Sequence, residues 1–429
     1  MMRSFVFWFF IAALANNLNS SALAQRVNYE EAPINYSTSK PDNRISQLQD
    51  QLTDHTVSLS FDEHTGYLRS LLETLRVPVS SQVLTFGRTS LQDDKISPTT
   101  PRAIYFTDDI HLGFVQNGLI EIAVQDSKLG MVFYTLRQTP DEPPVFQRQT
   151  NSCLTCHGAA RTKNVPGVLI RSVYPDPEGH PVVAAGSFLS THRSPLSQRW
   201  GGWYVTGRHG EQQHLGNFVL TSAKKPKTID NSAGHNLERL ADRFDTTKYL
   251  GPHSDLVALM VLEHQTDTLN VLTQTSFEVR HAEYLLSQAG ENSEQKAAAT
   301  KLLNDRLVKN TEQIVKAFLF ADEVALTSSV SGTSEFATHF AMNSKRDSKG
   351  RSLRDFDLQT RMFKFPCSYL IETPAFRDLP ETLREQVLIR LSKFLNSDES
   401  IKGLERLSAI DRTAILEILR ETVPGFPAN

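Results

Sequence analysis

Residues 103–136 read AIYFTDDIHLGFVQNGLIEIAVQDSKLGMVFYTL, and this stretch decides the fold of the first half of the chain. It contains four short runs rich in β-branched and aromatic residues, with turn residues such as Asn117-Gly118 between them. The runs are Ala103 to Phe106, His111 to Val115, Leu119 to Val124 and Met131 to Leu136. Runs of this length and composition, bounded by such turns, predict β-strands. We therefore expect antiparallel sheet here, within a β-rich region.

A cysteine motif follows the strands, in Asn151-Ser152-Cys153-Leu154-Thr155-Cys156-His157-Gly158. Cys-x-x-Cys-His is the attachment signal for covalent haem c, in which each cysteine adds across one vinyl group. His157 is then the expected proximal ligand of the iron. A disulfide or half of a zinc site is the alternative, but a zinc site needs a second ligand pair and the remaining cysteine, Cys367, stands alone. The motif predicts one covalently bound haem c.

The N-terminus carries the pattern of a secretory signal peptide. Arg3 precedes the apolar run from Phe5 to Ala15, and Ala22-Leu23-Ala24 is a small-x-small cleavage site. The run is shorter than the roughly 20 apolar residues of a membrane-spanning helix. We expect cleavage after Ala24 and a periplasmic protein without a membrane span, which agrees with the attachment of haem c outside the cytoplasm.

Composition excludes some classes of function. The chain has 429 residues and a formal net charge of −3, so no basic surface for nucleic acid is expected. A chain of this length exceeds what one core usually organises, which predicts two or three domains. Cys367 is expected to be a buried, small apolar residue.

The order of sequence patterns predicts an α+β protein, in contrast to compact cytochromes c, which are helical around the haem. Helix-forming composition dominates after residue 253, where we expect helices at 255–287, 293–326, 380–395 and 408–420. The predicted order is a signal peptide (1–24), a flexible leader (25–57), a β-rich haem c domain (58–225), a linker (226–252) and a helical domain (253–429).

The second axial ligand of the iron has two candidate sources. The first is the glycine-rich segment from Thr191 to Asn217, which holds three histidines, both tryptophans of the mature chain, and arginines suited to haem propionates. The second is the helix expected from residue 255, with Met260 and His264 one turn apart. Histidines outnumber methionines after the motif, and the glycine-rich segment is expected to continue the sheet that carries the motif, whereas Met260 and His264 lie in a separate helical domain. We therefore predict His214 as the ligand and His264 as the next choice. The alternatives are that Met260 is core filler and that His214 is an exposed turn residue.

The motif from Cys153 to His157 resembles that of the c-type cytochromes, and the chain from about Gln82 onward resembles large secreted monohaem proteins described only as cytochrome c domain-containing. This resemblance implies haem binding and electron transfer, without a known substrate. The chain departs from small cytochromes c because no methionine follows the motif until Met260.

Three functions fit these observations. The leading hypothesis is single-electron transfer by a periplasmic haem c protein to an unidentified redox partner protein. The second is a haem-dependent redox enzyme, peroxidase-like or acting on another small molecule, with an open distal site. Its expected lining comes from His192, Arg193, Arg208, His209 and His214. The third, a haem-based sensor, lacks an output signature in the sequence.

Overall fold

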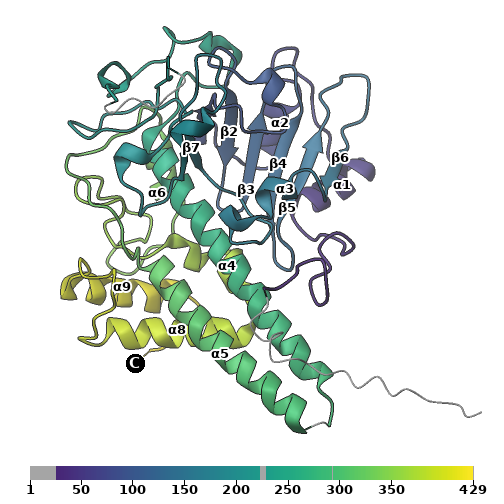
Figure 1. Ribbon diagram of the computed structural model, residues 1–429, viewed down its shortest axis with the longest axis vertical. Helices are drawn as coiled ribbons and strands as arrows, with labels where there is room; N and C mark the ends of the chain where they lie inside the picture. Colours follow the sequence, from purple (N-terminus) through teal and green to yellow (C-terminus); the bar gives the residue numbers. More distant parts are fainter. Residues whose placement is uncertain (1–25, 223–228, 292, 429) are drawn as a thin grey trace, which may run out of the picture.

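The structure is a computed structural model that describes residues 26–222, 229–291 and 293–428. The predicted signal peptide and its cleavage after Ala24 lie outside the described residues. The architecture is α+β, as predicted, with one six-stranded antiparallel sheet and a helical C-terminal region (Figure 1).

The six-stranded sheet is an antiparallel meander, in which each strand pairs with the next along the chain. Short turns join the four strands expected at 103–136, so consecutive runs pair directly. All four expected strands are present, with ends within two residues of the prediction. The strands are β1 (Val83–Thr85), β2 (Arg102–Phe106), β3 (Ile110–Phe114), β4 (Ile120–Asp126), β5 (Gly130–Leu136) and β6 (Phe146–Gln149).

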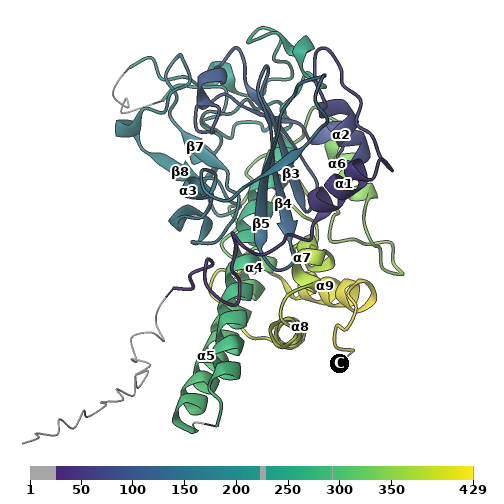
Figure 2. The ribbon, with the colours of Figure 1, turned by 90° about the vertical axis from the view of Figure 1, so that its right-hand side faces the viewer.

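Both faces of the sheet are covered. Figure 2 shows α1 (Arg44–Thr53) and α2 (Leu68–Thr74) on one side, and α3 (Leu154–His157) with the hairpin of β7 (Arg171–Val173) and β8 (Ser187–Leu189) on the other. Every residue of β5 is consequently buried. A sheet enclosed in this way leaves room for a site between the sheet and α3.

The segment 25–57, expected to be a flexible leader, is folded in the structure from residue 26 onward. It contains α1, which Asn43 caps by accepting hydrogen bonds from the amides of Ile45 and Ser46. The side chains of Ile34 and Tyr36 are buried, and the Tyr36 hydroxyl donates to the carbonyl oxygen of Met131 at 2.9 Å. The sequence pattern did not reveal this because the segment gains its order from contacts with the sheet.

The C-terminal region is built on an antiparallel helix pair, α4 (Leu256–Gln288) and α5 (Ser293–Phe318), as predicted (Figure 1). The second helix ends eight residues before the predicted 326, because Phe320 and Asp322 adopt positive φ values of 56° and 62°. α8 (Glu381–Leu395) packs on α5, and α9 (Ala409–Thr422) packs on α8. The shorter helices α6 (Phe336–Met342) and α7 (Pro374–Arg377) contact α4.

The start of α4 is tied to the sheet. Asp255 is the N-cap, and its Oδ1 accepts hydrogen bonds from the amides of Val257 and Ala258. Oγ of the preceding residue, Ser254, accepts a hydrogen bond from the amide of Leu84 in β1 at 2.8 Å. The helix therefore begins at a fixed position against the sheet edge.

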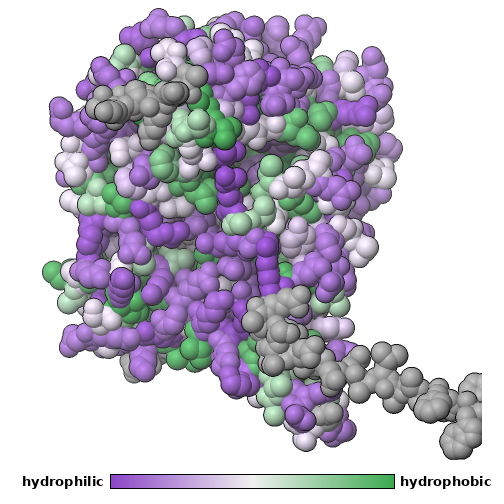
Figure 3. All heavy atoms as spheres, in the orientation of Figure 1, coloured by the Kyte–Doolittle hydropathy of each residue, from purple (hydrophilic) through white to green (hydrophobic). Residues whose placement is uncertain are grey.

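The hydrophobic core is continuous between the β-rich and helical regions. Leu240, Phe244 and Tyr249, from the segment 226–252 expected to be a linker, belong to the same buried cluster as the sheet and the C-terminal helices. Cys367 is buried in that cluster, as predicted. Across the described ranges, every helix is too short or too polar to cross a membrane. Figure 3 shows a largely hydrophilic face with hydrophobic side chains in small groups.

Candidate cofactor site

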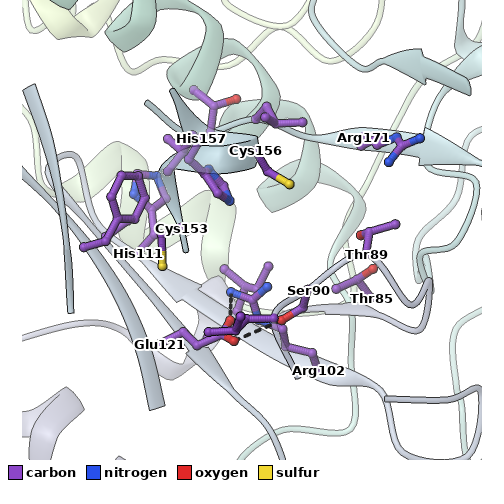
Figure 4. Close-up of a pocket in the computed structure, with 18 of the residues that line it drawn as sticks. Thr85, Thr89, Ser90, Arg102, His111, Glu121, Cys153, Cys156, His157 and Arg171 are labelled. Carbon is purple, nitrogen blue, oxygen red and sulfur yellow. Dashed lines mark hydrogen bonds and ion pairs between the residues drawn. The ribbon is translucent and has the colours of Figure 1, made fainter. Parts of the chain in front are cut away.

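The Cys-x-x-Cys-His residues form one helical turn. α3 spans Leu154–His157, and the amide of His157 donates to the carbonyl oxygen of Cys153 at 2.9 Å. Positions i, i+3 and i+4 of a helix share one face, so this turn brings Cys153, Cys156 and His157 together. All three side chains line one cavity of about 520 Å³, and both thiols are free (Figure 4). The spacing of the motif thus places both thiols and the imidazole on the wall of the same cavity.

The imidazole of His157 is held in one tautomer. Its Nδ1 lies 2.9 Å from the carbonyl oxygen of Gly167, and a carbonyl oxygen can only accept, so Nδ1 carries the proton. Burial lowers the pKa of His157, which favours the neutral imidazole that binds metals. The ring packs on Phe133 with a centroid separation of 5.1 Å. The remaining lone pair, on Nε2, is available as a metal ligand.

Helix α4 positions the segment that orients His157. Asn270 accepts a hydrogen bond from the amide of Val168 at 3.2 Å and donates one to its carbonyl oxygen at 2.7 Å. A Cβ atom on the neighbouring Gly167 would overlap Oδ1 of Asn270 and lie 2.9 Å from its Cγ. Only glycine lets α4 approach so closely. Partners behind a metal-binding histidine of this kind fix its orientation.

The cavity is apolar on most of its walls. Ile104 and Phe133 come from the sheet, Ile170 precedes β7, and Leu262 comes from α4. Trp203 also lines the cavity, and its Nε1 donates to the carbonyl oxygen of Arg171 at 2.9 Å. Volumes of this size and walls of this character are typical of sites for organic cofactors and ligands.

A charged pair lies across the cavity from the imidazole of His157. Arg102 and Glu121 form an ion pair of 2.8 Å, and Ser90 donates to Glu121 at 3.0 Å. Figure 4 shows these side chains across the cavity from the imidazole of His157. Arg102 and Glu121 are also the charged groups whose electrostatic influence reaches His157. The sequence pattern did not point to either residue as part of the site.

Two further arginines line the cavity without a carboxylate partner in the part of the chain that the structure describes. They are Arg161 and Arg171. Burial and the positive charge of Arg161 lower the pKa of Arg171. Its Nε is buried and without a hydrogen-bond partner among the described residues. Two cations side by side, one of them partly buried, suit an anionic ligand group such as a carboxylate.

His264 does not lie among the described residues that line the cavity. Its ring is fully buried and stacks on Phe320 with a centroid separation of 4.1 Å. Its Nδ1 is 3.2 Å from Nδ1 of His192, and its Nε2 is 2.8 Å from Oγ of Ser368. Met260, on the same helix, is a core residue. Both ring nitrogens of His264 thus contact buried side chains that pack around α4.

His214 also lies apart from the motif, in a cluster of aromatic rings. Its Nδ1 accepts a hydrogen bond from the amide of Gly216 at 3.0 Å, and its ring is 4.6 Å from that of His209 and 5.5 Å from that of Trp200. His214 is buried, contrary to the alternative of an exposed turn. The structure does not bring His214 or His209 to the described lining of the cavity.

The arginines of the same segment are also engaged elsewhere. Arg193 pairs with Asp267 at 2.7 Å, and Arg208 pairs with Glu238 at 2.5 Å. Of the segment expected to face the haem, Trp203 is the residue found in the described lining. Thr206 of this segment contacts the start of α4, where its carbonyl oxygen accepts a hydrogen bond from the amide of Leu256.

His111 lines the cavity and was not singled out from the sequence. In the sheet register it pairs with Ala123, which pairs in turn with Phe133, so it belongs to the row of residues beneath His157. Burial lowers the pKa of His111 to about 4. Its presence at alternate positions with Gly113, inside an otherwise apolar strand, was the signal that could have found it.

The described residues contain no group of three or more His, Cys, Asp or Glu side chains arranged to hold a metal ion directly. No family model, curated protein or solved structure matches the chain.

Proposed function

We propose that this chain binds one haem c and transfers single electrons. The proposal rests on one observation: Cys153, Cys156 and His157 line the same cavity, and Nδ1–H of His157 donates a hydrogen bond to the carbonyl oxygen of Gly167, which leaves Nε2 free for a metal. Each thiol would form a thioether with a vinyl carbon, the thiol proton passing to the adjacent carbon. Nε2 of His157 would bind the iron, which supplies the one-electron couple.

The fit to haem extends beyond the motif. The walls contributed by Ile104, Phe133 and Leu262 suit the apolar face of a porphyrin and exclude water. Arg161 and Arg171 would bind the negatively charged propionates, because neither arginine pairs with a carboxylate among the described residues. Asn270 and Gly167 would hold the proximal histidine in orientation. The resemblance to secreted cytochrome c domain-containing proteins is part of this proposal, as is export to the periplasm.

A second candidate function is a haem-dependent redox enzyme with an open distal site. The observation that favours it is the composition of the cavity wall: the described lining contains no methionine, and its histidines are His111 and His157. The distal residues expected from sequence, His192, Arg193, Arg208, His209 and His214, do not belong to that lining. Arg102 and Glu121 take their place in this second hypothesis.

Haem attachment is tested by expressing the full chain with its N-terminal segment in a host that matures c-type cytochromes. We expect haem staining after denaturing electrophoresis and an increase of one haem in polypeptide mass. Cys153→Ala with Cys156→Ala should abolish both signals. Cys367→Ala is the matched control, because this thiol is buried in the core, and it should retain them. An unmodified mass in the wild-type protein would overturn the proposal.

Export is tested in the same preparation. The N-terminus of the purified protein should begin at Gln25, directly after the predicted cleavage site. The protein should also be released with the periplasmic fraction. A mature chain that retains residues 1–24 in the cytoplasmic fraction would contradict the localisation.

A further inference from the structure

We propose that the side of the cavity opposite His157 is a binding site for a small anion, which Arg102 would hold against the iron. This inference rests on the proposed haem binding and adds a ligand class to it. The chemistry required is a small, monovalent anion that can accept hydrogen bonds from a guanidinium.

Arg102 is held in place by the strand beside it. Its guanidinium lies across Gly113 of β3, where a Cβ atom would come within 2.5 Å of Nε and 2.8 Å of Cζ. Ile104 pairs with Gly113 in the sheet register, so the side chain of Arg102 reaches diagonally over its neighbour. Glycine at position 113 therefore creates the space in which this guanidinium sits.

Hydrogen bonds from neighbouring side chains hold Glu121 in place. The ion pair with Glu121 then fixes Arg102 without using all of its N–H donors. The carboxylate accepts hydrogen bonds from Ser90 at 3.0 Å and from Gln92 at 3.0 Å, and it forms an ion pair with Nη2 of Arg102 at 2.8 Å. A guanidinium has five N–H donors, and the ion pair with Glu121 uses one terminal nitrogen. Nε of Arg102 is buried against Gly113, whereas the side chain as a whole is 22% exposed and lines the cavity. The terminal N–H donors that Glu121 does not use are thus left for a ligand in the cavity.

The sheet register places Arg102 across the cavity from the imidazole of His157. His111, Ala123 and Phe133 form the row of the sheet beneath the imidazole. Gly113 and Glu121 form a row two residues further along the strands. Figure 4 shows the cavity between the imidazole of His157 and the Arg102–Glu121 pair.

A guanidinium attracts an anion more strongly than a neutral ligand, and the carboxylate of Glu121 beside it offsets part of that attraction. The apolar walls lower the local dielectric, which strengthens the attraction between a guanidinium and a nearby negative charge. Donors on the distal side of a haem decide which small ligands bind there. Neither His214 nor His264 belongs to the described lining, so neither competes for the site in this structure.

The test uses the ferric haem-loaded protein, with fluoride as the anionic probe and imidazole as the neutral probe, both followed by absorption spectra. In Arg102→Leu the Kd for fluoride should rise about tenfold or more, as expected for loss of a charge-assisted hydrogen bond. The Kd for imidazole should change much less. Arg208→Leu is the matched control, because it removes an exposed arginine that pairs with Glu238 and does not belong to the described lining of the cavity, and it should leave fluoride binding close to wild type.

Gly113→Ala is the second variant, because its new methyl group displaces the guanidinium while both charges remain. It should weaken fluoride binding in the same direction, which keeps the test decisive even if Arg102→Leu fails to fold. Absence of haem in the wild-type protein would mean that the proposed function itself is wrong. With haem attached, a wild-type ferric protein that does not bind fluoride, or equal fluoride affinity in wild type and Gly113→Ala, would overturn the anion site alone.

Discussion

Asn270 in α4 binds both backbone groups of Val168: Oδ1 accepts from the amide at 3.2 Å, and Nδ2 donates to the carbonyl oxygen at 2.7 Å. The carbonyl oxygen of the adjacent residue, Gly167, accepts a hydrogen bond from Nδ1 of His157. Through these two contacts the long helix of the C-terminal region controls the orientation of the motif histidine, although 113 positions separate Asn270 from His157 in the sequence.

The first prediction concerns this contact. Asn270→Leu leaves the amide and carbonyl of Val168 buried without partners, so the free energy of unfolding should fall by about 2–4 kcal/mol. In the haem-loaded protein the midpoint potential should also shift, because the imidazole loses its fixed orientation. Urea unfolding and redox titration measure the two effects.

Asn310→Leu is the matched control for this variant. Asn310 is a buried asparagine of α5 whose Nδ2 and Oδ1 have no hydrogen-bond partner among the described residues. Its replacement by an apolar side chain should leave stability unchanged or raise it. Equal destabilisation by the two variants would show that the Asn270 contact has no special role.

The second prediction concerns the N-cap of α4. Asp255 is buried and caps the helix with Oδ1, while its Oδ2 accepts from the amides of Thr333 and Ser334 at 2.8 Å each. Asp255→Ala should lower the free energy of unfolding by about 3 kcal/mol or more, because it removes the helix cap and leaves the amides of Thr333 and Ser334 without their acceptor. Ser408→Ala, at the cap of α9, should cost only about 1 kcal/mol in the same urea titration.

The third prediction is a pH dependence of stability. Burial holds the pKa of His264 well below its ordinary value of 6.5, so the folded chain does not bind a proton that the unfolded chain binds. The stability due to neutral His264 is present above about pH 6.5 and is lost as the pH falls below it. At pH 5.5 the loss is about 1.4 kcal/mol for this residue.

His264→Gln should therefore reduce the difference in unfolding free energy between pH 7.5 and pH 5.5 by about that amount. His180 supplies the control, because its side chain is exposed. His180→Gln should leave the difference as in wild type. An unchanged pH dependence in His264→Gln would contradict the prediction.

The fourth prediction concerns Arg171, a cavity arginine that forms no ion pair with a carboxylate among the described residues. In the haem-loaded protein, Arg171→Gln removes a positive charge near the iron, which stabilises the ferric form relative to the ferrous form. The midpoint potential should fall by roughly 20–60 mV. Arg208→Gln removes an exposed arginine that pairs with Glu238, and its potential should remain within a few millivolts of wild type. Spectroelectrochemical titration compares the two variants.

Much of the fold could be predicted from sequence where local pattern decided it. The strands at 103–136 and the helix at 408–420 are present close to where they were expected, because turn residues and side-chain caps such as Ser408 act within a few positions. The order of residues 26–57 could not be predicted. Tyr36 is held by Met131, and the polar composition of its own segment gives no sign of that contact.

For the candidate site, the sequence by itself determined which side chains share a face: Cys153, Cys156 and His157 stand at i, i+3 and i+4 of one turn, and helix geometry requires no distant partner. Only the tertiary structure decided what lies opposite them. Sheet register and the missing side chain of Gly113 place Arg102 in the cavity. Contacts with His192 and Phe320 hold His264 elsewhere, and a cluster of rings that includes His209 and Trp200 holds His214 elsewhere. The physical reason is range: a helical turn is set by neighbouring residues, whereas the far wall of a cavity is set by contacts between strands and helices distant in the chain.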